Sequence, residues 1–182
     1  MAINPATDIL IRRSTTSGSA GDTVAGTTAD ALGKYMSTSA ALAALHDLFP
    51  ALTGAQNAAS QVDYRCIFVY NNHATLTWVN ATAYLTSEVS GGTSLALGLD
   101  PTGVVAKGSA SAQAATIGSS TSAPAGVTFL AGTAIDTDAE GLALGDIGPG
   151  QVRAIWIRRT AANSSAVNAD GGVLSFSGDT AA

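Results

Sequence analysis

The chain of 182 residues carries a net charge of −5 at neutral pH, and only 12% of its residues are charged, about half the usual share. Its eight Lys and Arg residues are dispersed along the sequence, so the basic footprint that nucleic-acid binding requires is missing. The single cysteine, Cys66, excludes an intrachain disulfide framework and a zinc site built from cysteines.

The first 61 residues are irregular, and we expect them to form an extended N-terminal arm. Residues 7–13, "TDILIRR", predict one short strand, and the Gly/Ser/Thr-rich residues 14–34 predict a loop. The start of the sequence has no basic segment followed by a long apolar run, so we expect no secretory signal. No window reaches the ~18 apolar residues of a membrane span, and we expect no membrane partner.

Residues 37–50, "STSAALAALHDLFP", predict one short helix. A hydroxyl side chain at 37–39 (Ser37, Thr38 or Ser39) would cap its first turn by accepting a backbone hydrogen bond. Pro50 would end the helix, because its ring disfavours a helical conformation at the preceding residue. Apolar residues recur at spacings of three and four, as on one face of a helix: Leu42, Leu45, Leu48 and Phe49.

Residues 62–105 predict strands. "VDYRCIFVYNN" (62–72) combines aromatic and β-branched residues and is apolar on both faces, which is typical of a central strand covered on each side. Asn71–Ala74 predicts a turn, because Asn tolerates positive φ. Residues 75–88 predict one bent strand or two, and residues 93–100 predict another.

Residues 106–126 have low complexity and no apolar period, which predicts a long surface loop. Four short strands should follow, at 127–132, 141–146, 152–160 and 173–178. Seven to nine short strands with regular turns indicate a mainly β fold. We therefore expect residues 62–182 to form an antiparallel β-sandwich, immunoglobulin-like or jelly-roll-like, preceded by the arm and the short helix of residues 1–61.

Catalytic patterns are sparse. The two histidines are His46 and His73, and no G-x-S-x-G motif places a serine nucleophile on a sharp turn. Cys66 lies mid-strand among apolar neighbours, where a thiol is typically buried and inert. We expect neither an enzyme nor a cofactor. An enzyme would require His73, Cys66 and an aspartate to meet in the fold.

Residues 136–141, "DTDAEG", form the one metal-like pattern. Asp136, Asp138 and Glu140 alternate before a glycine, as in the first half of a calcium loop. The glutamate expected six residues after that glycine is missing, because Ile147 stands there. We expect a solvated acidic turn, with a weak calcium site as the alternative.

The tryptophans and arginines each allow two interpretations. Trp78 and Trp156 lie mid-strand and are typical of a core, although they or the tyrosines could form a sugar-stacking platform. Arginines lie on or beside the predicted strands, where they either pair with carboxylates across a subunit contact or protect strand edges by charge. The candidate interface residues are Arg12, Arg13, Arg153, Arg158 and Arg159.

Two long stretches, residues 31–81 and 141–180, resemble a family of small structural proteins encoded in the virion modules of tailed bacteriophages. The most specific parts are "DYRCIFVYNNHATLTW" (63–78) and "IGPGQVRAIWIRRT" (147–160). The resemblance implies a component of the virion, assembled in the host cytoplasm, whose partners are other virion proteins such as the major capsid protein or tail proteins. It also makes a homo-oligomer plausible, and it brings no catalytic residues with it.

Three functions fit these expectations. The first is a non-enzymatic capsid decoration or cement protein that acts through many subunit contacts. The second is a structural protein of the tail, the baseplate or the fibre attachment. The third is a carbohydrate-binding module on the virion.

Overall fold

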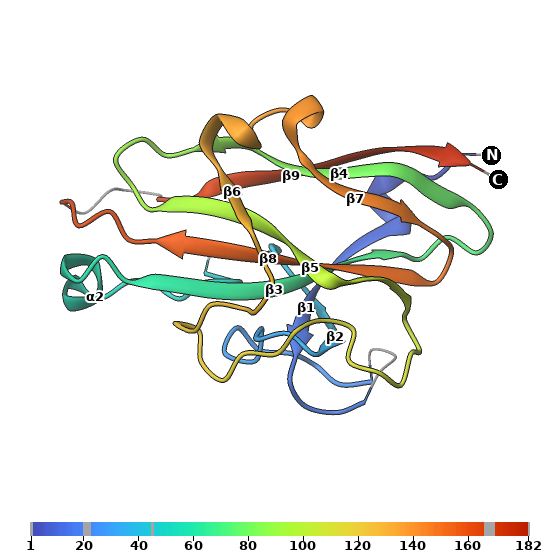
Figure 1. The fold of residues 1–182 in the computed structure, drawn as a ribbon, viewed down its shortest axis with the longest axis horizontal. Coiled ribbons are helices and arrows are strands. Elements are labelled where there is room, and N and C mark those ends of the chain that lie inside the picture. Colours follow the sequence, from blue (N-terminus) through green and yellow to red (C-terminus); the bar gives the residue numbers. More distant parts are fainter. Residues whose placement is uncertain (1, 20–22, 45, 166–169, 182) are drawn as a thin grey trace.

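The computed structural model describes residues 2–19, 23–44, 46–165 and 170–181. Two antiparallel sheets are packed face to face (Figure 1), which confirms the prediction of a mainly β sandwich. The large sheet contains, in spatial order, β2 (Tyr35–Ala40), β1 (Ile9–Thr15), β3 (Val62–Asn71), β8 (Gln151–Thr160), β5 (Ser94–Ala106) and β6 (Phe129–Ala131). The small sheet contains β7 (Leu142–Ile147), β4 (Thr77–Glu88) and β9 (Gly172–Ala181).

Helical structure is limited to short pieces. These are α1 (Pro5–Asp8), α2 (Gly54–Ala58) and two 3₁₀ turns, η1 (Gly132–Ala134) and η2 (Asp138–Glu140). At the start of α2, the side chain of Thr53 accepts from the backbone nitrogen of Gln56, and the side-chain oxygen of Gln56 accepts from the backbone nitrogen of Thr53. This capping box satisfies two donors that the first turn leaves free.

The helix predicted over residues 37–50 is wrong. Residues 35–40 form β2, and the described residues that follow are turns and bends; Leu45 lies outside the described residues. The Ser37 hydroxyl donates to the carbonyl of Arg13 on β1 instead of capping a helix. Leu42 and His46 have φ values of 63° and 58°, which a right-handed helix excludes. Pairing with β1 therefore overrode the local apolar period.

The arm predicted for residues 1–61 contributes two strands to the large sheet. β1 pairs with β3 from Ile9 opposite Asn71 to Arg13 opposite Ile67, and β2 pairs with β1. The short strand predicted near residues 7–13 is therefore confirmed. A division of the chain at residue 61 stays a prediction, but β1 and β2 are hydrogen-bonded parts of the sheet.

The turn predicted after β3 is confirmed and also ties the two sheets together. The side-chain nitrogen of Asn71 donates to the carbonyls of Leu76 (2.9 Å) and Ile147 (2.8 Å), and its side-chain oxygen accepts from the backbone nitrogen of His73 (3.0 Å). Ile147 ends β7 of the small sheet, so one buried side chain links three segments. Beyond the turn, residues 77–88 form the single bent strand β4, whose register shifts at bulges.

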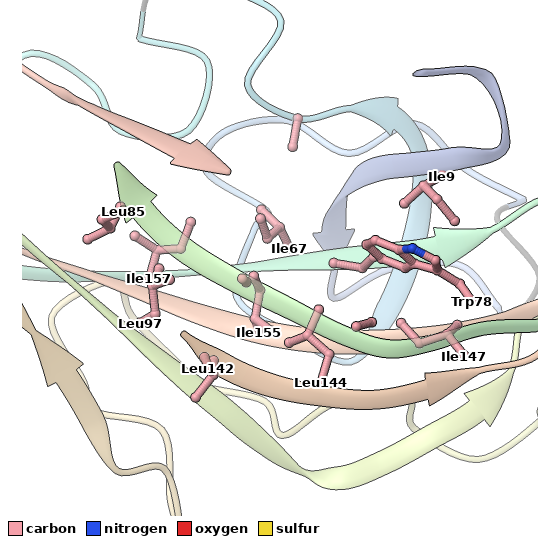
Figure 2. Packing of buried hydrophobic residues seen from close by; sticks show 14 of the residues in the cluster. Ile9, Ile67, Trp78, Leu85, Leu97, Leu142, Leu144, Ile147, Ile155 and Ile157 are labelled. Atoms are coloured by element: carbon pink, nitrogen blue, oxygen red, sulfur yellow. The ribbon is translucent and has the colours of Figure 1, made fainter. Parts of the chain in front are cut away.

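The main hydrophobic core lies between the sheets (Figure 2). Trp78 of β4 is 1% exposed and packs in this core, which confirms its interpretation as a core residue. Side chains alternate between the two faces of a strand, so β3 and β8 supply every second residue to this cluster. The buried members from β3, β8, β7 and β4 include Ile67, Val69, Ile155, Ile157, Leu142, Leu144, Ile147, Ala83 and Leu85.

A second core covers the opposite face of the large sheet. Trp156, Phe68 and Cys66 point to this side and are fully buried. Residues 107–128, which include most of the surface loop predicted over 106–126, run across this face and bury Ala114 and Ile117 against it. β3 and β8 are therefore covered on both faces, as the two-sided apolar pattern predicted.

A buried carboxylate holds that covering loop in place. Asp100 is 1% exposed and accepts from the Trp156 indole (2.8 Å) and from the backbone nitrogens of Ala115 (2.9 Å) and Thr102 (2.9 Å). Close packing also requires Gly33, because a Cβ there would lie 1.8 Å from the carbonyl oxygen of Ala115. Within the described residues, no helix is long and apolar enough to cross a membrane.

We predict that Asp100→Ala destabilises the fold by about 3 kcal/mol, because the buried Trp156 indole and two partly buried backbone donors lose their acceptor. Urea unfolding monitored by tryptophan fluorescence measures the change. Asp179→Ala is the matched control, since Asp179 is exposed on β9, and it should shift the free energy of unfolding by less than ~0.5 kcal/mol. Equal effects of the two substitutions would refute the anchoring role of Asp100.

Candidate functional site

An apolar cavity of about 880 Å³ opens between the sheets at the end of the sandwich where α2 lies. Its walls come from the ends of strands in both sheets: Leu85 of β4, Leu174 of β9, Leu95 of β5 and Ile157 of β8. Figure 2 shows Leu85 and Ile157, which also belong to the main core. The segment between β2 and α2 supplies Leu48 and Phe49. The cavity has the size and apolar character of a binding site.

The floor of the cavity is held by an internal ion pair. Arg159, which lines the cavity, donates from Nη2 to the Asp63 carboxylate at 2.7 Å and from Nη1 to the carbonyl of Pro50 at 2.7 Å. Its guanidinium also lies over the ring of Phe49, 4.8 Å from the centroid. These contacts fix the segment before α2 against the end of β8.

Asp63 is the only carboxylate at this cluster in the described part of the chain, and two arginines surround it. Burial alone would raise the pKa of Asp63, but hydrogen bonds from Arg159, Gln61 and Ser120 outweigh burial and hold this pKa below its ordinary value. Burial lowers the pKa of the neighbouring Arg65, against the attraction of Asp63. Asp63 therefore serves the fold as a charged acceptor.

The candidate interface arginines have different environments. Arg13 pairs with the Asp47 carboxylate and Arg159 with Asp63, so both have partners within the chain. Arg12 donates to the carbonyl of Thr38 at 2.6 Å. The other two, both on β8, are Arg153, which is buried, and Arg158, which stacks 5.3 Å from the centroid of Phe129. Contact of these five residues with another subunit stays a prediction.

The acidic turn at 136–141 makes local hydrogen bonds. The Asp138 carboxylate accepts from the hydroxyls of Ser177 and Thr82, which lower its pKa, and Glu140 accepts from Thr137 at 3.0 Å. Asp136 is exposed. In the described ranges, no group of three or more His, Cys, Asp or Glu residues is placed to hold a metal ion.

The residues that an enzyme would need do not meet. Burial, followed by the nearby Asp100, raises the pKa of the Cys66 thiol well above its ordinary value. The His73 Nδ1 accepts from the backbone of Thr75 (3.1 Å) and Leu76 (3.0 Å) in the turn after β3. Trp156, like Trp78, is buried, so neither offers an exposed platform for stacking a sugar.

The surface charge divides sharply between the two sheets. Seven exposed acidic residues and no Lys or Arg belong to the small sheet and the segments joined to its strands: Glu88, Asp136, Asp138, Glu140, Asp146, Asp170 and Asp179. All eight basic residues lie on or beside strands of the large sheet. The other six acidic residues belong to residues 8–100 of the sequence, and Asp22 among them lies outside the described residues. Three of the basic residues are buried and the other five are half-buried. In the described part of the chain, the charged residues that are fully exposed are therefore these seven carboxylates.

Sequence reasoning missed the cavity and the charge division. The cavity is built from the segment interpreted as a helix and from the ends of four strands, which only the packing of the sheets brings together. Asp63 lies within a predicted strand, and no local pattern identifies it as the partner of Arg159. The one signal that the sequence offered is that six of the eight basic residues, although dispersed along the chain, lie on β1, β3 and β8, which are neighbours in the large sheet.

We predict that Asp63→Ala destabilises the protein by about 3 kcal/mol at pH 7, because removing one partner of a buried ion pair leaves the other charge unpaired. The native pKa of Asp63 lies below its ordinary value of 3.8. Its stabilising contribution is therefore complete above that value and is lost as the pH falls through the native pKa.

Denaturant unfolding between pH 7 and pH 2.5 tests this prediction. The difference between the wild-type chain and Asp63→Ala should shrink as the solution is acidified below 3.8. Asp136→Ala, which removes an exposed carboxylate, is the control and should show a small difference at every pH. A difference for Asp63→Ala that stays constant with pH would contradict the assignment.

No protein-family model, curated protein or solved structure matches this sequence or its fold.

Proposed function

We propose that this chain is a non-enzymatic structural component of a tailed-phage virion that decorates or cements the capsid. The resemblance of residues 63–78 and 147–160 to phage structural proteins supports a place in the virion. The observation that carries the mode of action is the division of charge between the sheets. A protein that coats a particle must bind in one orientation, and a one-sided field orients it.

The acidic small sheet is the side that meets the partner. Its seven exposed carboxylates have no Lys or Arg among them, so their potentials add instead of cancelling. Such a face attracts a basic surface and repels another acidic one, which governs association rate and orientation more than affinity. The partner is then a virion protein that presents Lys and Arg at the site of attachment.

The internal use of the reactive side chains supports a non-enzymatic role. Cys66 is buried, the His73 ring is occupied by the backbone of its own turn, and Asp100 and Asp63 each accept several hydrogen bonds that hold the fold. A catalytic base needs an accessible lone pair within reach of its substrate. These groups are committed to structure.

The copy number of the chain in purified particles tests this proposal. Quantitative mass spectrometry against the major capsid protein should find on the order of hundreds of copies, because decoration works through many repeated contacts of modest strength. A handful of copies would assign the chain to the tail or baseplate instead. Its absence from particles would reject a virion function.

Raising the salt concentration should release the chain from particles, because a Debye length of ~3 Å at 1 M salt screens exposed charges. Sedimentation of particles at 0.1 M and 1 M salt, followed by quantification of the chain in the pellet, measures the loss. Retention of all copies at 1 M salt would contradict attachment through the acidic sheet.

A further inference from the structure

We propose that the free edge of β9, together with the adjoining cavity, binds an extended strand donated by a different protein chain. The expected strand alternates apolar residues with small polar ones and carries Lys or Arg near its ends. This inference concerns a specific binding site and does not depend on the location of the chain in a virion.

The outer edge of β9 is long and unpaired, and the N-terminal segment reaches the strand near its end, where the backbone nitrogen of Ile3 donates to the Thr180 hydroxyl (3.1 Å). β9 has ten residues and pairs only with β4; in the ranges that the structure describes, no strand lies on its other side. The other edge strands, β2, β6 and β7, have six, three and six residues. Short edge strands, charges and prolines are the usual protection against unwanted pairing. Residues 172–178 of β9 contain neither charge nor proline, so the edge is unprotected.

The inner face of β9 is incompletely covered. Leu174 and Phe176 point toward the core but are only partly buried, whereas Ala83 and Leu85 of the neighbouring β4 are 0% and 5% exposed. The small sheet has three strands and the large sheet has six, so the small sheet ends at β9 while the large sheet continues. One more strand beside β9 would cover these two side chains.

The cavity lies where the side chains of such a strand would point. Gly171, Gly172 and Leu174 belong to the cavity wall and also to the start of the open edge. Alternate side chains of a strand paired with β9 face the large sheet, and there they meet the apolar wall formed by Ile157 and Leu95. Backbone pairing at the edge then provides affinity, and the cavity selects the side chains.

Charge identifies the donor as a different protein. Asp170 precedes β9 and Asp179 lies near its end, and both are exposed, so the ends of the site favour Lys or Arg. A second copy of β9 is a poor occupant, because antiparallel self-pairing over the whole strand would bring acidic ends together. No Lys or Arg lies within the other edge strands β2, β6 and β7, so no free edge strand of a second copy supplies the complementary charge.

A displayed library of random decapeptides, selected against the immobilised full chain, tests the site. We expect the enriched peptides to alternate apolar residues and to carry Lys or Arg near an end. The synthetic form of an enriched peptide should slow hydrogen exchange of the β9 amides, since pairing protects the edge. Selection of peptides without this alternation, or no selection at all, would overturn the proposal, as would protection confined to another strand.

A cavity-filling substitution provides the matched variant. A Cβ at Gly171 meets no heavy atom within 4 Å, so Gly171→Leu is tolerated by the backbone and occupies part of the cavity. We expect it to weaken binding of the selected peptide at least tenfold. Gly118→Leu, at another open glycine in the loop over the opposite face, should leave affinity unchanged. Equal affinity of both variants for the peptide would refute a role of the cavity.

A charge variant and a measurement of mass complete the test. Asp179→Lys should weaken binding of Lys-ended peptides and leave unfolding unchanged, so it remains informative if Gly171→Leu folds poorly. Sedimentation of the purified chain should show no association through β9; a dimer that the selected peptide dissociates would assign the edge to a second copy and overturn the proposed donor. These outcomes are independent of copy number in particles.

Discussion

The pairing of β3 with β8 is the constraint on which the rest of the structure depends. Nine residue pairs join the two strands, from Val62 opposite Thr160 to Tyr70 opposite Val152, and most side chains of both are buried. Two adjacent strands that are apolar on both faces need two covering layers. The small sheet provides one layer, and residues 107–128 with the segment before β2 provide the other.

Covering both faces also determines where charge can lie. Arg65, Arg153 and Arg159 are carried into the interior by these central strands, and each buried charge or polar group then needs a partner. Asp63 serves Arg159, while Asp100 serves the indole of Trp156 and the backbone of the covering loop. The basic side chains are therefore buried or half-buried within the chain. The exposed carboxylates of the small sheet are left to dominate the surface.

The unequal size of the two sheets connects the fold to recognition. The three strands of the small sheet cannot cover the six strands of the large sheet. The small sheet therefore stops at β9, while the large sheet continues through β1 and β2. The segment 41–54 covers only part of the remaining apolar surface, and the cavity is what it leaves open. The open edge of β9, the cavity and the acidic surface of the small sheet thus have one structural origin, which is the small number of strands in that sheet.

The sequence by itself determined most of the strands, with β2 the exception, because alternation and β-branched residues are local signals. Residues 62–72 identified a central strand, and Asn71 identified the turn after it. The helix expected over 37–50 failed because Ser37 bonds Arg13 of a neighbouring strand, which no local pattern reveals. The tertiary structure alone decided which groups pair with Arg159 and Trp156. It also decided the cavity between four strand ends and the separation of charge between the sheets. Each depends on contacts between residues far apart in the chain, and sequence spacing carries no information about which strands become neighbours.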